Sequence, residues 1–522
     1  MSETSGAAPP IHASFSLHAA ARPDAPAVRH DGEAISYGTL DAASDAYAAV
    51  LSARGVGIGQ IVPLALPRSP QLIAVQLAVL KCGAAYANID LGWPDERRAA
   101  IFAQTAPKIV VTGPADVSAG DAGVLPLEAE DVRDVAARAP GFTPAAVTPA
   151  DPATVFFTSG TTGGPKGVVV PHQAVTRLFG EGGLDGFGPG HATPQAAAIA
   201  WDMYAFELWG QLSSGGCAVF VPGDHLMPGS LRESIRHAGV DTLWLTTSLF
   251  NLFVDEDVDC FAGLTHVLIG GEKLSPAHVR GFLARHPSIP LRNGYGPVEN
   301  CMLTTTHLVQ PEDCDIAEGI PVGSDVPGTT VHILSETGMP CAPGEIGEVC
   351  IEGTGLAVSY LDQTQMTAEK FPTVLVDGTP VRMYRTGDLG FRDDHGVLHF
   401  RGRRDRQVKI SGYRIELAEI EIAARAVDGV RECLVVTLGG PDGQISGLAL
   451  FYVAEQADSS ADSHTGNGPD EHAVRKALTR VLPGYLVPGV VRRLDRFPVT
   501  ANGKADQAEL RRLAKKSRRG RP

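Results

Sequence analysis

The segment Thr158–Gly167, with the sequence TSGTTGGPKG, directly follows the short apolar run from Ala153 to Phe157. It contains four glycines, four hydroxyl residues and one lysine. A loop of this composition after a strand brings backbone N–H groups and hydroxyls close to phosphate oxygens, and the lysine adds positive charge. It is not a Walker A loop, because Gly167 and not Ser or Thr follows Lys166. The segment, called here the phosphate loop, therefore predicts a phosphate site of another type.

Beyond the phosphate loop, short apolar runs alternate with segments of helical character. The runs are 168–170, 218–221, 242–245 and 266–268, and the helical segments include 230–238 and 276–285. This alternation predicts parallel sheets with crossover helices, an α/β fold. After about Gly344 closely spaced strands and turns follow. After Arg404 two amphipathic segments, 416–427 and 471–482, predict helices of a smaller α+β unit.

Composition excludes several classes of protein. The chain has 522 residues, with 44 Lys plus Arg against 59 Asp plus Glu, a net charge of −15 that argues against nucleic-acid binding. No secretory signal and no uninterrupted apolar stretch of about 18 residues is present. The eight cysteines form no CxxC pair, which argues against a disulfide framework or a zinc site. We therefore expect a cytoplasmic protein with no membrane segment.

Further segments resemble, in order along the chain, the motifs of the adenylate-forming (ANL) enzymes. This superfamily includes acyl-CoA synthetases, luciferases and the adenylation domains of nonribosomal peptide synthetases, and the phosphate loop resembles its phosphate-binding signature. The other matching segments are 80–86, 293–299, 344–349, 353–360, 384–389, 402–409, 412–421, 482–485 and 502–504. Because these segments span nearly the whole chain, the chain is identified as a member of this superfamily.

The resemblance implies two domains. Residues 1–404 are expected to form a large N-terminal domain with parallel and mixed sheets flanked by helices, plus a β-rich subdomain. This domain would hold the ATP and amino-acid sites. Residues 405–522 are expected to form a small, mobile α+β domain that rotates about a hinge at Asp405.

The resemblance also implies a reaction and its residues. In this superfamily a carboxylic acid attacks the α-phosphate of ATP in the presence of Mg²⁺, and a thiol then captures the acyl group. The implied ATP-binding residues are Thr158, Ser159, Gly160, Thr161, Thr162, Gly163, Lys166, Gly271, Glu272, Asn293, Gly294, Tyr295, Gly296, Asp388 and Arg403. Asn293 would hold the adenine edge, Tyr295 its face, and Asp388 the ribose hydroxyls with help from Arg403.

Three of the implied residues are catalytic. Lys504 would reach the α-phosphate and the substrate carboxylate, and Lys409 would enter the site for the second half-reaction. Glu299, with Thr162, would bind Mg²⁺, which prefers oxygen ligands. Val298 occupies the position before Glu299 where the superfamily usually has Thr, so one hydroxyl contact to phosphate is missing or replaced.

The segment from Trp201 to Glu207 resembles the block in which peptide-synthetase adenylation domains bind the substrate α-amine through an aspartate. In this chain the corresponding residue is Asp202. A buried ammonium must be paired, so a carboxylate here favours amino acids over plain carboxylic acids. The remaining pocket positions are Met203, Phe206, Trp244, Leu268, Gly270, Gly294, Met302 and Leu303, with Lys504 closing the site. Apart from Asp202 and Lys504 none is charged, which favours an apolar substrate side chain. The set resembles valine-type pockets. Met203 and Met302 should reduce the volume of the pocket, so the substrate could be valine, 2-aminobutyrate, alanine or a compact ring amino acid.

No phosphopantetheine attachment site follows Lys504, so we expect a freestanding enzyme that loads the phosphopantetheine thiol of a separate carrier protein. The need for an MbtH-like helper protein stays open. The competing interpretations are an acyl-CoA synthetase and a non-catalytic ligand-binding relative. The presence of Lys504, Glu299 and Asp388 disfavours the second.

Overall fold

The computed structural model describes residues 8–114, 120, 122–160, 163–180, 182–221, 223, 225–376, 378–439, 445–455, 468–498 and 505–519, with side chains up to residue 515. The chain divides into two compact units. The first contains Met1–Leu91, Phe102–Phe157 and Gly167–Arg404, and the second contains Gly92–Ile101, Thr158–Lys166 and Asp405–Pro522. Most of the phosphate loop thus clusters with the second unit, whereas the sequence analysis placed it with residues 1–404. The reason is local, because Ser159 and Gly160 make their hydrogen bonds to residues after 405.

Two sheets form the N-terminal part of the first unit. One has the order β2–β1–β10–β9, with β1 Pro26–His30, β2 Glu33–Ser36, β9 Ala192–Gln195 and β10 Cys217–Phe220. The other has the order β18–β8–β7–β4–β3–β5–β6, with β3 Ile61–Ala65, β4 Ala85–Asn88, β5 Ile109–Thr112, β6 Gly123–Pro126, β7 Pro152–Thr158, β8 Lys166–Pro171 and β18 Ser359–Tyr360. Strands β3 and β4 run parallel and are almost entirely buried, as expected for a sheet covered on both faces.

A third sheet carries four residues of the predicted amino-acid pocket, Trp244, Leu268, Gly270 and Gly294. Its order is β11–β12–β13–β14–β15, with β11 Thr242–Thr246, β12 His266–Gly270, β13 Leu291–Tyr295, β14 Thr305–Leu308 and β15 Ser324–Asp325. The first three strands are parallel, and their register places Leu268 beside Trp244 and Gly270 beside Gly294. Residues paired in this way have side chains on the same face of a sheet.

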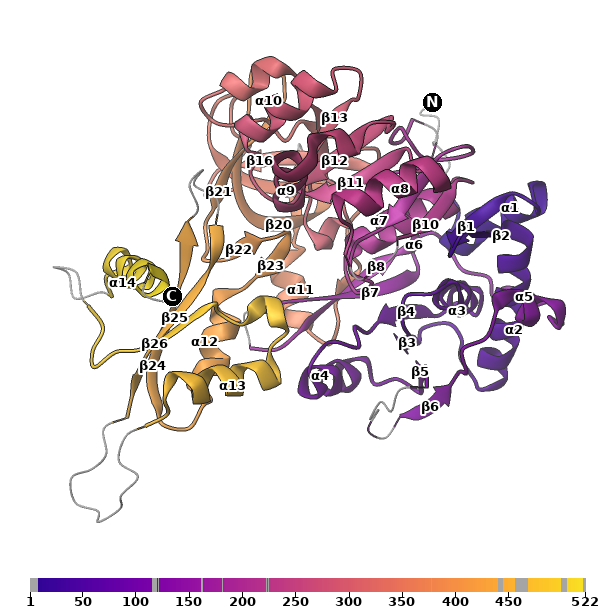
Figure 1. Cartoon of the computed structure of the whole chain (residues 1–522), viewed down its shortest axis with the longest axis horizontal. Helices are drawn as coiled ribbons and strands as arrows, with labels where there is room; N and C mark the ends of the chain where they lie inside the picture. The colour runs from indigo at the N-terminus through magenta and orange to yellow at the C-terminus, as the bar shows by residue number, and fades with distance from the viewer. Residues whose placement is uncertain are drawn as a thin grey trace, which may run out of the picture. The chain divides into compact units, whose positions relative to one another are not determined.

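Helices connect the strands of this part of the chain. They are α1 Ile11–Ala21, α2 Tyr37–Ala53, α3 Pro70–Lys81, α4 Asp95–Thr105, α5 Val132–Ala137, α6 His172–Thr176, α7 Asp202–Leu212, α8 Pro228–Ala238, α9 Thr247–Asp257, α10 Pro276–Arg285 and α11 Thr364–Lys370, with short 3₁₀ helices η1 Val258–Phe261, η2 Val298–Asn300 and η3 Pro311–Asp315. Helix α3 begins where Ser69 accepts the Leu72 N–H and Pro70 fixes φ. It is mostly apolar and buried along nearly its whole length, and it lies beside β3 and β4 (Figure 1).

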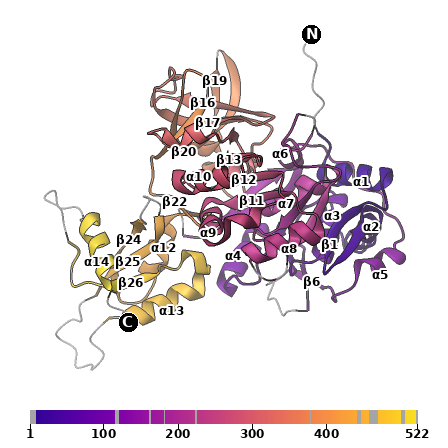
Figure 2. The same cartoon turned by 45° about the horizontal axis from the view of Figure 1, so that its top comes forward.

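An antiparallel region follows, as predicted from about Gly344 onward. Its strands are β16 Thr329–Leu334, β17 Gly347–Gly353, β19 Thr373–Val376, β20 Thr379–Arg392 and β21 Leu398–Arg403, in the order β16–β17–β20–β19 with β21 beside β20 (Figure 2). The pairing of β20 with β21 places Asp388 opposite Arg403.

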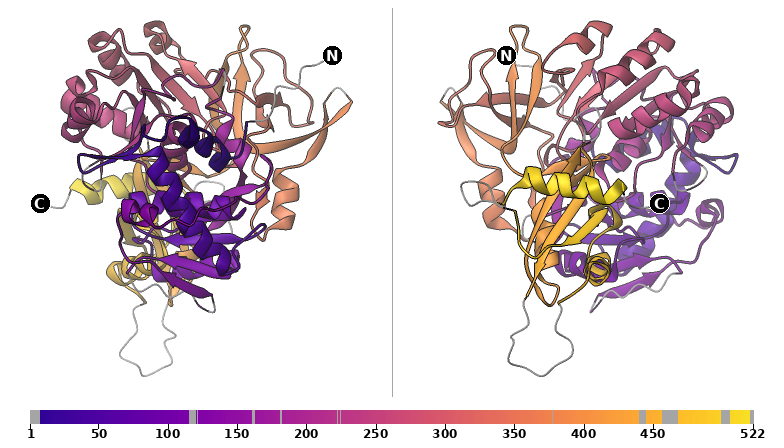
Figure 3. Two further views of the ribbon diagram at one scale, coloured as in Figure 1. Left: turned by 90° about the vertical axis from the view of Figure 1, so that its right-hand side faces the viewer. Right: turned by 60° about the vertical axis from the view of Figure 1, so that its left-hand side comes forward.

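The second unit is α+β. Its elements are β22 Val408–Ile410, β23 Tyr413–Ile415, α12 Leu417–Arg425, β24 Val430–Gly439, β25 Ile445–Ala454, α13 Glu471–Val481, η4 Gly484–Leu486, β26 Val490–Arg493 and α14 Gln507–Arg519. Alternate residues of β25 belong to different cores: Leu448 and Leu450 pack with α12 and α13, whereas Ala449 and Phe451 pack with α14. The helices therefore cover both faces of the β24–β25–β26 sheet, with α14 across one of them (Figure 3).

Candidate active site

Asp202 is the first residue of α7 and is buried. One of its carboxylate oxygens accepts the N–H of Met302 at 3.2 Å. The start of a helix carries partial positive charge, which interacts favourably with a carboxylate. The position therefore offers a negative group beside the loop that contains Met302.

The apolar residues predicted for the amino-acid pocket are all buried, and several of them are in contact. A Cβ atom added at Gly270 would lie 3.3 Å from the Trp244 ring, and one added at Gly294 would lie 2.8 Å from Leu303 and 3.6 Å from Leu268. The rings of Phe206 and Trp244 lie 6.4 Å apart. Met203 and Met302 are buried in the same apolar cluster.

Glycines let the backbone segments of this site approach one another closely. A Cβ at Gly270 would lie 2.1 Å from the carbonyl oxygen of Gly294, and one at Gly296 would lie 2.2 Å from the carbonyl oxygen of Met302. A larger residue at either position would push apart β12 and β13, or β13 and the following loop. Only glycine fits here.

The segment Val298–Thr304, called here the substrate loop, contains two residues in the left-handed backbone region. Cys301 has φ 48° and Met302 has φ 69°, a conformation that costs free energy in residues other than glycine. Arg177 stabilises this shape by donating to the carbonyls of Asn300 at 2.8 Å and Leu303 at 2.6 Å. It is buried, and burial lowers its pKa to about 10. The sequence analysis missed Arg177, whose signal is a lone arginine in the otherwise uncharged run 172–179.

Glu299 lies in η2 and is completely buried. The hydroxyl of Tyr360 donates to one of its carboxylate oxygens at 2.8 Å, and its carbonyl accepts the N–H of Ala357. Tyr360 thus orients the carboxylate predicted to bind Mg²⁺. The motif 353–360 pointed to this segment but not to that contact.

The residues predicted to bind the nucleoside lie together on β13, β20 and β21. Tyr295 donates from its hydroxyl to Asp388 at 2.5 Å, and Arg403 donates to the other oxygen of the same carboxylate. Burial, and next the negative charge of Asp388, raises the pKa of Tyr295 well above its ordinary value. Asn293 donates to the carbonyl of Pro321 at 2.7 Å.

Gly271 and Glu272 follow β12. Gly271 has φ 88°, which favours glycine. The carboxylate of Glu272 accepts the hydroxyl of Ser248 at 2.6 Å, so the turn after β12 is tied to α9.

In the second unit, the phosphate loop is bound by groups around β23 and α12. The N–H of Gly160 donates to Glu419 at 2.9 Å, and the other carboxylate oxygen of Glu419 pairs with Arg97 at 3.0 Å. Ser159 donates to the carbonyl of Arg414 at 2.7 Å and accepts the N–H of Glu416. Burial raises the pKa of Glu419, and Arg97 opposes that shift. A loop N–H that a phosphate could use is here bound by a carboxylate.

The remaining predicted residues belong to the phosphate loop and to the chain after residue 404. Thr158 donates from its hydroxyl to the carbonyl of Lys166, a buried residue, and a Cβ at Gly163 would lie 2.7 Å from Ile422. Lys409 is half-buried on β22, and Asp405 accepts the N–H of Gln407. Thr161, Thr162 and Lys504 lie outside the described residues.

The side chains of the site fit the binding of ATP together with Mg²⁺. Among the described residues no group of three or more His, Cys, Asp or Glu side chains could hold a metal ion by itself. Mg²⁺ usually takes one or two carboxylates and completes its coordination with substrate phosphates and water. A single buried carboxylate, Glu299, suits that pattern. In the part of the chain that is described, no helix has the length and apolar character needed to cross a membrane.

Comparison with known proteins identifies the family. Residues 15–361 match the model of the AMP-binding enzymes, and residues 419–504 match that of the AMP-binding enzyme C-terminal domain. The chain is 37% identical over 94% of its length to malpibaldin synthetase of Mortierella alpina, and 35% identical over 95% to tyrocidine synthase 3 of Brevibacillus parabrevis. It spans only 9% and 7% of those two proteins.

Solved structures agree with this comparison. The chain superimposes with a TM-score of 0.86 and 33% identity on a nonribosomal peptide synthetase protein that contains adenylation and PCP domains, covering 97% of this chain and 84% of that one. It superimposes with a TM-score of 0.81 and 26% identity on an artificially fused adenylation–PCP di-domain from Klebsiella oxytoca, covering 94% and 95%. The predicted architecture, a large N-terminal α/β domain followed by a smaller C-terminal one, is confirmed. The chain belongs to the AMP-binding enzyme family, and within it to the adenylation domains of nonribosomal peptide synthetases.

Proposed function

We propose that this chain activates a small aliphatic, valine-like α-amino acid with ATP, and then transfers the aminoacyl group to the phosphopantetheine thiol of a carrier protein. The observation that carries the proposal is the position of the buried carboxylate of Asp202, which accepts the N–H of Met302 beside an uncharged pocket. A carboxylate can pair with the substrate ammonium, and the pocket leaves no partner for a polar side chain.

In the first half-reaction a carboxylate oxygen of the amino acid attacks the α-phosphorus of ATP. The bond from that phosphorus to the pyrophosphate oxygen breaks, which gives aminoacyl-AMP and pyrophosphate. Glu299 and Thr162 would hold Mg²⁺, which when bound would neutralise phosphate charge. The protein supplies no nucleophile, so its contribution is orientation and charge stabilisation. In the second half-reaction the carrier thiol loses its proton and attacks the acyl carbon, and AMP leaves.

Asp388, Tyr295 and Arg403 support the nucleoside part of the proposal. Their hydrogen bonds fix a carboxylate that can accept both ribose hydroxyls, while the ring of Tyr295 can cover the adenine. The similarity to solved structures that contain adenylation and PCP domains supports a carrier protein as the acceptor.

The proposal is tested by ATP–pyrophosphate exchange with a panel of amino acids. We expect exchange with valine, 2-aminobutyrate or alanine and little with charged or large aromatic amino acids. Each methylene that misfits an apolar pocket costs about 1–3 kcal/mol, or about 10- to 200-fold. Strong exchange with plain carboxylic acids, together with acyl transfer to free CoA, would contradict the proposal and indicate an acyl-CoA synthetase.

We also propose that the two half-reactions use different positions of residues 405–522, with the hinge at Asp405. Lys504→Ala should lower adenylate formation about 10²–10³-fold, the scale for loss of one transition-state donor, and spare transfer from preformed adenylate. Asp405→Pro should spare exchange and lower carrier loading, because proline restricts φ. Equal losses in both half-reactions for both variants would contradict the hinge.

A further inference from the structure

One face of helix α7 carries three residues at helical spacing, Asp202, Phe206 and Gly210. Residues four apart lie one above the other on a helix. Asp202 is the proposed amine partner and Phe206 is a proposed pocket residue, so Gly210 lies one turn further from the amine. Glycine inside a helix costs about 0.5–1 kcal/mol relative to alanine, so its presence needs a structural reason.

The reason is a pair of phenylalanines outside the predicted pocket. A Cβ atom at Gly210 would lie 2.6 Å from the Phe187 ring and 3.0 Å from the Phe179 ring. The Phe187 ring packs edge-on against Phe206, with centroids 5.2 Å apart and planes at 81°. Phe179 lies 4.7 Å from Phe187 and 5.5 Å from Phe206. Phe206 is therefore supported by a second layer of aromatic rings that fills the space above Gly210.

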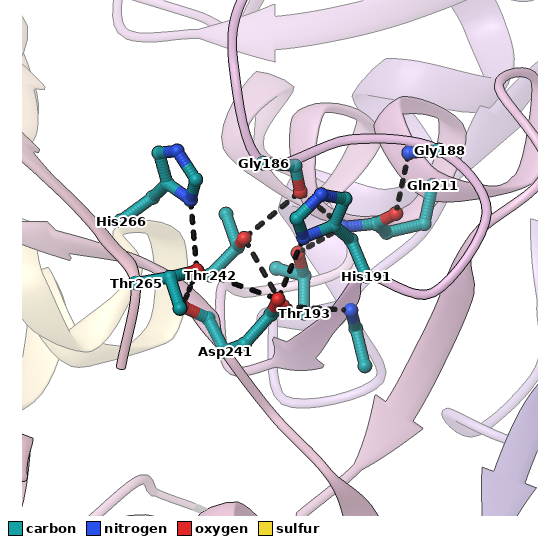
Figure 4. Close-up of polar contacts among 10 residues, drawn as sticks. Gly186, Gly188, His191, Thr193, Gln211, Asp241, Thr242, Thr265 and His266 are labelled. Atoms are coloured by element: carbon teal, nitrogen blue, oxygen red, sulfur yellow. Dashed lines mark hydrogen bonds and ion pairs between the residues drawn. The ribbon is translucent and has the colours of Figure 1, made fainter. Parts of the chain in front are cut away.

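The loop that carries Phe187 is fixed on both sides of that residue by Gln211, the neighbour of Gly210. The Gln211 amide donates to the carbonyl of Gly186 at 3.0 Å and accepts the N–H of Gly188 at 3.3 Å (Figure 4). The hydroxyl of Thr242 donates to the same Gly186 carbonyl at 2.8 Å. Phe187 is thus held in position by its backbone as well as by ring packing.

Behind Phe206 and Leu268 the molecule is not filled solid. The two residues line a crevice together with Leu184 and Phe187, and its lining also includes Arg292, which forms an ion pair of 3.2 Å with Asp185. Part of the space beside Phe206 is therefore open, and the phenylalanine rings that pack against Phe206 are those of Phe179 and Phe187. Without Phe187, Phe206 could move into the crevice.

We propose that Phe187 sets the upper size limit of the amino-acid side chain, as a positioning residue that acts through Phe206. The inference rests on the proposed function, since it takes Phe206 as a wall of the amino-acid pocket. While Phe187 packs against Phe206, the Phe206 ring stays in place and limits the length of the pocket. Without Phe187, the Phe206 ring can move away and the pocket becomes longer. The residue lies outside the pocket positions derived from the sequence.

The test is the ratio of kcat/KM for leucine to that for valine, measured by ATP–pyrophosphate exchange with the full chain. We expect Phe187→Ala to raise this ratio at least about tenfold, mainly through the KM for leucine, with the KM for ATP unchanged. Phe187→Leu should raise it less. Phe220→Ala, which removes another half-buried phenylalanine of the first unit, should leave it unchanged.

The ratio is independent of how much of a preparation is folded, so a merely structural role would lower both rates and leave it unchanged. A ratio within twofold of wild type in Phe187→Ala would overturn the inference. If that variant does not fold, the same result in Phe187→Leu would overturn it. If the wild-type chain shows no amino-acid-dependent exchange, it is the proposed function that fails.

Discussion

The substrate loop of the first unit and the phosphate loop segment of the second each depend on a buried arginine, but the two arginines have different partners. Arg177 donates to backbone carbonyls of the substrate loop. Arg97 pairs with the carboxylate of Glu419, which in turn accepts the N–H of Gly160. Arg177 therefore supports the substrate loop through neutral carbonyls, whereas Gly160 is bound by the carboxylate of Glu419, which a phosphate can replace. We interpret the substrate loop as preorganised by Arg177, and the contact of Glu419 with Gly160 as one that a phosphate can replace.

The largest effect is expected from Arg177→Met. The variant removes the Arg177 donor from the carbonyls of Asn300 and Leu303, and the Leu303 carbonyl keeps only a hydrogen bond of 3.4 Å from the Asn300 amide. A buried carbonyl left without a donor costs about 1–3 kcal/mol. We expect kcat/KM for the amino acid to fall about 100-fold in ATP–pyrophosphate exchange, with a higher KM for the amino acid. Arg177→Lys should rescue only part, because lysine lacks the planar fork of donors.

The matched control is Arg392→Met, since Arg392 also donates to backbone carbonyls, those of Gly396 and Val331, outside the site. It should leave the amino-acid KM near wild type. Wild-type kinetics in Arg177→Met would show that the substrate loop holds its shape without the arginine.

The next largest effect is expected from the buried ion pair Arg97–Glu419 of the second unit. Arg97 and Glu419 are both about 1% exposed, so loss of either leaves a buried charge unpaired. In a double-mutant cycle of Arg97→Met and Glu419→Gln, measured by denaturant unfolding, we expect a favourable coupling of about 1–3 kcal/mol. The more exposed pair Arg512–Glu509 on α14 serves as the control and should show a smaller coupling. Additive effects at Arg97 and Glu419 would mean that the pair does not hold the loop.

A further test in the first unit concerns the pH dependence of stability and a buried carboxyl group. Glu207 on α7 accepts the N–H groups of Ala196 and Ala197, and burial raises its pKa from 4.5 to about 8. Between these values the folded chain binds a proton that the unfolded chain has lost, so stability falls as the pH rises. The steepest slope is about 1.4 kcal/mol per pH unit.

Glu207→Gln should remove this component, so the difference in unfolding free energy between wild type and variant should change between pH 5 and pH 8. The measurement is denaturant unfolding of both proteins across that range. Parallel pH profiles would contradict this prediction, because they would show that the pKa of Glu207 is the same in the folded and the unfolded chain.

Much of the fold could be predicted because local pattern and tertiary structure agree. The segment 276–285 forms α10 over the predicted residues, and the apolar runs 242–245 and 266–268 lie in β11 and β12. Leu417, Ile420 and Ala424 are buried as their spacing predicted, whereas Val427 lies beyond the end of α12 and is half-buried. All eight cysteines are free in the structure.

The supports of the site could not be predicted. Arg177, Phe187 and Tyr360 act on residues 19 to more than 100 positions away, and no periodicity connects such pairs. Their effects depend on which backbone atoms or rings the fold brings beside them. The contact of Glu419 with Gly160 is likewise a product of tertiary structure, since 258 residues separate the two in the sequence.

The central claim, that Asp202 makes this chain an amino-acid activator, is tested most directly with a matched pair of acids. Valine and 3-methylbutanoate differ in the α-amine and share the same branched side chain. The measurement is ATP–pyrophosphate exchange with each, for wild type and Asp202→Ala. We predict exchange by the wild type with valine and not with 3-methylbutanoate. Loss of valine activity in the variant should reach a few hundredfold or more, because a stranded charge costs about 3–5 kcal/mol. Equal exchange with both acids, or a variant as active on valine as wild type, would contradict the account.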